Sequence, residues 1–125
     1  MENILDMTIK ETRDLLRKRE ITAVELTSFF LDRAKRYDGG LQAYLRMTEE
    51  LALETARDAD RRMALGEDGP LLGIPFGIKD IFCTKGVEKN CAYQILKGFT
   101  TPYDATVIQK HKDAHFVHLG RLNMD

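Results

Sequence analysis

The sequence feature that most constrains the fold is an apolar segment, residues 73–82, that carries a lysine close to its end. Its isoleucine and phenylalanine residues predict a buried strand over residues 74–82, interrupted by Pro75 and Gly77. Because it is costly to bury an ammonium group, a lysine at position 79 of this strand requires an explanation. The segment is therefore the first candidate for a functional site.

Two explanations for Lys79 follow from the residues alone. Desolvation favours a neutral amine over an ammonium, and a neutral amine accepts a proton, so Lys79 is a candidate general base. Alternatively, Lys79 stands at the end of the strand with its amine in water, and Asp80 lies on the opposite face of the pleat. The pattern leaves both explanations open.

Start signals predict three helices in the first half of the chain. Thr8 with Glu11, and Thr22 with Glu25, match the capping box, in which the two side chains bind free backbone N–H groups at a helix start. Thr48, followed by two glutamates, begins the third helix.

Glycines predict where two of these helices end. Gly39–Gly40 ends the second helix and Gly66 the third, because glycine tolerates the left-handed backbone of a helix end. Residues 41–47 alternate between apolar and polar, which predicts a short strand. The segment Gly66–Pro70 then separates a mainly helical layer from an α/β part.

The α/β part contains one more helix and one more strand. Asp104 is a favourable N-cap for a helix that runs to about Ala114. The apolar residues after it predict a buried strand over 116–119 that ends at Gly120.

The charge balance excludes some classes of partner. The 125 residues carry 19 Lys and Arg against 20 Asp and Glu, so the chain has no overall basic surface for nucleic acid or anionic lipid. The basic clusters Arg17–Arg19 and Arg33–Arg36 are interpreted as solvated helix faces, with phosphate contacts as the alternative. The longest apolar stretch, Leu71–Ile78, is too short to cross a bilayer, and the acidic start does not resemble a signal peptide. We expect a soluble, cytoplasmic chain without membrane contact.

The cysteines and histidines allow two further sites. On one continuous helix, His111, His115 and His118 would share a face and could hold zinc, but a strand after residue 115 would turn them apart. Cys83 or Cys91 could form a nucleophilic dyad with a histidine, although free cysteines are more often inert core residues. We expect no metal site here.

Several sequence blocks, in order along the chain, resemble the amidase signature family. These are Leu72–Asp80, Thr84–Val87, Pro102–Val107 and Leu119–Asp125, and the helix over 26–34 and the strand over 41–47 also match. Within the family the chain is most similar to the glutamine-hydrolysing subunits of tRNA-dependent amidotransferases. The resemblance implies an α/β fold in which N-terminal helices (1–66) precede the first strands and helices of a mixed-sheet core (70–125). It also implies that residues 1–125 are an incomplete, N-terminal portion of one amidase domain.

The resemblance implies a Ser–cis-Ser–Lys triad, of which only the lysine transfers, to Lys79. One serine attacks the amide, a second serine in a cis peptide relays the proton, and the lysine is the final base. The family's serines lie downstream of the lysine, whereas the only serine of this chain is Ser28, which helical spacing places on the second helix. We therefore expect no amide hydrolysis by this chain alone.

The chain departs from the family pattern at two histidines. His115 replaces a glycine expected just past a helix end, at a cost of about 1 kcal/mol if the residue is left-handed. His118 replaces an apolar strand residue.

The function implied by the resemblance is release of ammonia from glutamine, in a complex with amidotransferase subunits B and C that converts Glu-tRNA(Gln) to Gln-tRNA(Gln). The partner subunit would use ATP and Mg²⁺ and hold the tRNA, and no cofactor is expected in this chain. Two alternatives stay open. The chain is a non-catalytic module that binds the partner subunits, or a portion of another amidase-signature hydrolase.

Overall fold

The computed structural model describes residues 2–89 and 91–124, so Asp125, the last residue of the fourth sequence block, lies outside the described residues. In chain order the elements are the 3-10 helix η1 (Glu2–Asp6), α1 (Ile9–Arg17), α2 (Ala23–Leu41), β1 (Tyr44–Met47), α3 (Glu49–Ala64), β2 (Pro75–Lys79), the 3-10 helix η2 (Gln94–Leu96), α4 (Thr106–Asp113) and β3 (Val117–Leu122).

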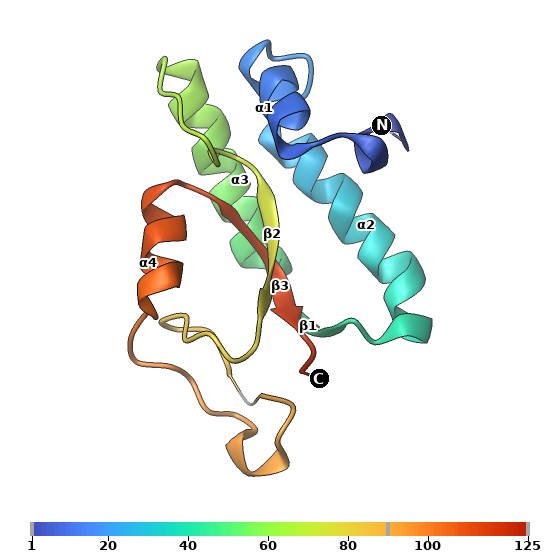
Figure 1. Cartoon of the computed structure of the whole chain (residues 1–125), viewed down its shortest axis with the longest axis vertical. Coiled ribbons are helices and arrows are strands. Elements are labelled where there is room, and N and C mark those ends of the chain that lie inside the picture. The colour runs from blue at the N-terminus through green and yellow to red at the C-terminus, as the bar shows by residue number, and fades with distance from the viewer. Residues whose placement is uncertain (1, 90, 125) are drawn as a thin grey trace.

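The strands form one mixed sheet with β3 in the centre. The order is β1-β3-β2, with β1 antiparallel and β2 parallel to β3. The parallel pair is joined by a crossover that contains α4, as parallel strands require. Figure 1 shows α4 on one side of the sheet and α2 on the other. The mixed α/β fold predicted from the sequence is therefore confirmed, while the division at residues 66–70 into two layers stays a prediction.

Apolar side chains of the helices pack against both faces of the sheet and form two clusters. The larger cluster joins α1, α2 and α3 to the strands, with Leu16, Leu26 and Val117 among its buried members. On α3 the buried residues are alanines (Ala52, Ala56 and Ala59), whose small side chains let neighbouring elements approach closely. The smaller cluster packs α4 against the sheet through Ile78, Ile108 and Phe116.

Both predicted capping boxes are confirmed. At the start of α1, the Glu11 amide donates to Thr8 Oγ1 at 3.2 Å and the Thr8 amide to Glu11 Oε2 at 2.7 Å. At the start of α2, the Glu25 amide donates to Thr22 Oγ1 at 3.0 Å and the Thr22 amide to Glu25 Oε2 at 2.9 Å. Asp60 of α3 adds a tertiary cap by accepting from the amides of Ala23 and Val24 at 2.7 and 3.1 Å. The start of α2 is thereby tied to α3.

The predicted end of the second helix at Gly39–Gly40 is wrong. Helix α2 continues through both glycines to Leu41, and Gln42 takes the left-handed conformation with a φ of 53°. The Gln42 amide donates to the Asp38 carbonyl at 2.7 Å, and the Asp38 carboxylate accepts from the Ala43 amide at 2.8 Å. These bonds occupy free backbone groups at the helix end. The strand predicted over 41–47 therefore begins only at Tyr44.

Asp104 is not the N-cap of α4. That position belongs to Ala105, which makes no side-chain cap bond. The Asp104 carboxylate instead accepts from the Lys85 amide at 2.8 Å and from Lys112 Nζ at 2.8 and 2.9 Å. The carboxylate therefore binds two lysines that are more distant in the sequence, and not the free amides at the helix start.

The predicted ends of two strands are also wrong. Strand β3 does not end at Gly120 but continues to Leu122, and a Cβ at position 120 would lie 2.8 Å from Tyr44 Cδ1. Gly120 thus allows the close approach of β1 rather than a strand end. Strand β2 covers only residues 75–79 of the predicted 74–82, because the chain turns after Lys79.

His115 has the left-handed backbone expected from its place after a helix, with a φ of 59°. We expect His115→Gly to raise the free energy of unfolding by about 0.5–1 kcal/mol, because glycine adopts this conformation without a Cβ penalty. Urea unfolding followed by circular dichroism measures the change. The control Lys110→Gly, on an exposed and regular position of α4, should lower the value by about 1 kcal/mol. A His115→Gly variant less stable than the parent would contradict the expectation.

Residues 80–105 form a long excursion between β2 and α4, seen below the sheet in Figure 1. An isolated bridge between Glu88 and Thr100 closes it. Its large apolar side chains are mostly exposed, and they include Ile81, Phe82, Tyr93, Ile95, Phe99 and Tyr103. None of the helices in the described part of the chain is both long enough and apolar enough to span a membrane.

Candidate functional site

The candidate general base, Lys79, is the last residue of β2. It pairs with Leu122 of β3, and its carbonyl accepts from the Phe82 amide at 3.1 Å, so the chain turns directly after it. The residue is partly buried. Lys79 therefore stands at the end of a parallel pair of strands, where side chains from neighbouring strands converge. Its catalytic role stays a prediction.

Asp80 is fully buried and is held from several directions. Its carboxylate accepts from Arg121 Nε at 2.9 Å, from an Arg46 guanidinium nitrogen at 3.0 Å and from the Cys91 amide at 2.7 Å. Its own amide donates to the Leu122 carbonyl at 3.2 Å, which extends the β2–β3 ladder by one residue. Asp80 is therefore the meeting point of β1, β2, β3 and the excursion, which the opposite-face interpretation of this residue did not predict.

Arg121 completes this buried cluster from β3. Its guanidinium is fully buried and, besides Asp80, donates to Thr84 Oγ1 at 2.8 Å and to the Phe82 carbonyl. The cluster thus places two guanidinium groups around one carboxylate. These bonds tie Arg121 to the segment directly after Lys79.

Sequence reasoning missed this cluster as a unit. Asp80 and Arg121 are 41 residues apart, and neither lies in a local sequence motif that predicts the other as its partner. A usable signal was nevertheless present, because Asp80 lies within one predicted buried strand and Arg121 directly follows the predicted end of another. Buried charges are normally paired, so two such positions of opposite sign predict each other.

The cysteines do not form the predicted alternative, a dyad with a histidine, within the described residues. Cys83 Sγ lies 3.3 Å from Lys89 Nζ, and Cys91 donates its amide to Asp80. Both thiols are free and partly buried. Neither has a histidine as a hydrogen-bond partner in the part of the chain that the structure describes.

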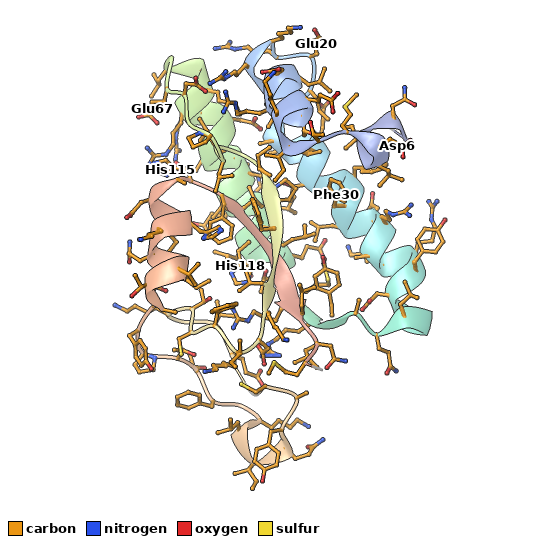
Figure 2. All side chains as sticks on the ribbon, viewed as in Figure 1. Asp6, Glu20, Phe30, Glu67, His115 and His118 are labelled. Carbon is orange, nitrogen blue, oxygen red and sulfur yellow. The ribbon has the colours of Figure 1, made fainter. Side chains whose placement is uncertain are left out.

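The histidines separate as the strand interpretation predicts. Figure 2 shows His115 past the end of α4 and His118 further along, on β3. His111 Nδ1 instead contacts the Val107 carbonyl at 2.7 Å, within α4. Among residues 2–89 and 91–124, no three His, Cys, Asp or Glu side chains are arranged to hold a metal ion.

His118 is the least expected buried group. It is 3% exposed, stacks on Phe116 at 6.0 Å, and neither ring nitrogen has a partner of regular hydrogen-bond geometry among the described residues. It lines a cavity of about 110 Å³ between α3 and α4. Burial, together with the positive charges of Arg121 and Lys112, lowers the pKa of His118 to about 4. The side chain is therefore neutral at neutral pH.

A family model settles where this arrangement belongs. Residues 25–125, which include the Lys79 segment and the Asp80–Arg121 cluster, match the model described as Amidase. The chain belongs to the amidase family.

Curated relatives of this amidase share nearly half of its residues. It is 46% identical over 98% of its length to the A subunit of glutamyl-tRNA(Gln) amidotransferase from Geobacter sp. (strain M21). It is 48% identical over 94% of its length to the protein of the same name from Methylococcus capsulatus. The chain spans about a quarter of the length of these relatives, 25% and 24% respectively.

Solved structures of amidases share the fold. An amidase family protein from Bacillus anthracis superposes with a TM-score of 0.90 at 25% identity, over 98% of this chain and 25% of that one. The peptide amidase of Stenotrophomonas maltophilia gives a TM-score of 0.88 at 28% identity, over 94% of this chain and 24% of that one. The arrangement of helices and strands described above is therefore one that recurs in the family.

Ser28 lies on α2, as its helical spacing predicts, and it is partly buried. It is the only serine of the chain, so this amidase sequence contains a candidate lysine but no pair of serines.

Proposed function

We propose that this chain supplies the lysine-bearing part of a glutamine-hydrolysing amidase, of the kind that serves a tRNA-dependent amidotransferase. The observation that carries the proposal is the 46% identity, over 98% of the chain, to the A subunit of a glutamyl-tRNA(Gln) amidotransferase. Lys79 is the general base that finally accepts the proton of the nucleophile. Its location at the end of β2, at the junction of strand and excursion, supports this role.

The nucleophile must come from sequence that this chain does not contain. A serine hydroxyl attacks an amide only when a base takes its proton, and the one serine here is part of α2. The chain by itself should therefore release no ammonia from glutamine. It acts together with a serine-bearing segment of an amidase domain.

The implied assembly includes amidotransferase subunits B and C. In it, ammonia passes from this amidase to the partner that uses ATP and Mg²⁺ and holds the tRNA, in the cytoplasm. The near-neutral charge of the chain, 19 basic against 20 acidic residues, is consistent with tRNA binding by the partner.

Complementation tests the proposed function. The 125-residue chain is mixed with the three-quarters of the Geobacter relative that it does not match, and ammonia release from glutamine is measured. We expect activity in the mixture, none in either part, and a loss of about 10²–10⁴-fold in Lys79→Ala. The matched control Lys85→Ala, at an exposed lysine of the excursion, should keep the activity. Full activity of Lys79→Ala would rule out the assigned role.

A second candidate is hydrolysis of other small amides. The observation in its favour is the structural similarity to the peptide amidase of Stenotrophomonas maltophilia at 28% identity. The same complemented mixture separates the two candidates, with C-terminally amidated peptides offered beside glutamine. A mixture that hydrolyses neither, but binds subunits B and C in a pull-down, would indicate a non-catalytic interaction module.

A further inference from the structure

The backbone at Lys79 passes directly from a strand into a turn. The Lys79 carbonyl already belongs to that turn, through the Phe82 amide at 3.1 Å. Strand ends fray when nothing ties them down, and displacement of a catalytic group by about 1 Å can lower a rate by about 10²-fold. The next residue, Asp80, makes bonds that keep this strand end in place.

We propose that Asp80, clamped by Arg121 and Arg46, is the positioning residue that fixes Lys79 in its place at the end of β2. The proposal rests on the proposed function, in which Lys79 is the base. Asp80 is fully buried, away from any substrate in solution. It acts through the backbone that it shares with Lys79.

The clamp holds Asp80 at both its backbone and its side chain. The amide bonds to Leu122 at 3.2 Å, and the carbonyl accepts from Arg121 at 3.3 Å. The carboxylate takes one guanidinium from β3 and one from β1, and both the Arg121 and the Asp80 side chains are fully buried. Because these donors come from both other strands of the sheet, residue 80 cannot move without disturbing the whole sheet.

The same carboxylate also holds strained backbone. Cys91 and Ala92 are consecutive non-glycine residues in the left-handed region, with φ values of 53° and 58°. The Cys91 amide donates to Asp80 Oδ2 at 2.7 Å. Such strain persists only where surrounding contacts over-determine the backbone, and it concentrates at functional sites. Asp80 thus binds the excursion at Cys91 as well as at its beginning.

Competitive acetylation of the 125-residue chain tests the proposal without any need for activity. Trace acetic anhydride is added, and the modification of each lysine is read by peptide mass spectrometry. We expect Asp80→Asn to raise the rate at Lys79 by about five-fold relative to exposed Lys10, because the strand end opens more often. Lys35 pairs with Glu49 at 2.7 Å, whereas Asp80 pairs with the two arginines, so the rate at Lys35 should not change. An unchanged Lys79 rate, or an equal rise at Lys35, would overturn the proposal.

Asp104→Asn is the matched control for this measurement. It removes an equally well bonded carboxylate of the same excursion, whose partner is Lys112 at 2.8 Å. This variant should raise the acetylation of Lys112 and leave that of Lys79 unchanged. Arg121→Lys keeps the positive charge but cannot reach Asp80, Thr84 and Phe82 together. We expect it to raise the Lys79 rate by about two-fold, with less risk to folding than Asp80→Asn.

The complemented amidase then shows whether positioning matters for catalysis. Asp80→Asn should lower kcat by about 10²-fold at unchanged KM, but it should have no further effect in a Lys79→Ala background, because the positioned group is gone. Equal losses in both backgrounds would mean a merely structural role and would overturn the proposal. If Lys79→Ala keeps full activity, the proposed function fails, while the acetylation rates still decide whether Asp80 fixes Lys79.

Discussion

Replacement of Arg121 by methionine should lower the free energy of unfolding by about 3–5 kcal/mol, the largest stability effect expected in this chain. The side chain is fully buried, and so is its partner Asp80. Methionine fills a similar volume but leaves the carboxylate without its β3 donor, and Thr84 and Phe82 without theirs. Urea unfolding, followed by circular dichroism, measures the loss.

A double-mutant cycle separates the ion pair from packing. The double variant Asp80→Asn with Arg121→Met should lose at least about 1 kcal/mol less than the sum of the two single losses. Each single variant leaves one charge of the pair without its partner, whereas the double variant removes both charges. The control is Arg61→Met, which breaks an exposed pair with Asp58 and should change stability by about 0.5 kcal/mol at most. Strict additivity of the two buried substitutions would contradict the pairing.

The second large effect is a loss of stability in mild acid that originates at His118. Its pKa is about 4 in the folded chain, against an ordinary value of 6.5. Between these pH values the unfolded chain binds a proton that the folded chain does not, so the free energy of unfolding falls as the pH falls. The free energy of unfolding falls by about 3 kcal/mol in total between pH 6.5 and pH 4. Above pH 6.5 His118 causes no loss.

His118→Leu should remove this acid dependence. At neutral pH it should also stabilise the fold by about 1–2 kcal/mol, because it replaces an imidazole without regular hydrogen bonds to the described residues by an apolar group. The variant keeps the other charged or titratable groups around position 118. Arg121 and Lys112 contribute to the low pKa of His118, and the cavity is lined by Asp58, Lys112 and His115.

Phe116→Leu is the matched control for His118→Leu. It changes the stacking partner of His118 without removing a titratable group. We expect it to lower stability equally at pH 7 and pH 5 and to keep the slope between pH 6.5 and pH 4. An unchanged acid slope in His118→Leu would show that another group is responsible.

The parts of the fold that the sequence predicts are those with local causes. Thr8 with Glu11 and Thr22 with Glu25 meet over three residues, so the local pattern is enough to predict both capping boxes. The left-handed backbone of His115 has a local cause as well, since the residue lies just past the end of α4, but only the family resemblance predicts it.

The errors share a physical origin, which is competition from partners far along the chain. Asp104 would cap α4 if it were free, but Lys85 and Lys112 occupy its carboxylate. Gly120 predicts a strand end from the sequence, but in the structure its missing Cβ makes room for Tyr44 of β1. The Asp80–Arg121 pair spans 41 residues and has no local signature. In the candidate site, the sequence therefore predicts Lys79 but not the residues that hold it.

The central place of β3 has a consequence for the order in which the chain can fold. Strands β1 and β2 do not pair with each other, and each hydrogen bonds only to β3 within the described sheet. During synthesis both must wait, as unpaired segments, until residues 117–122 have left the ribosome. The helices can cap and pack earlier, since their signals are local. We therefore expect the sheet, and the site around Lys79 with it, to form late, after the closure of loops of about 40 and 75 residues.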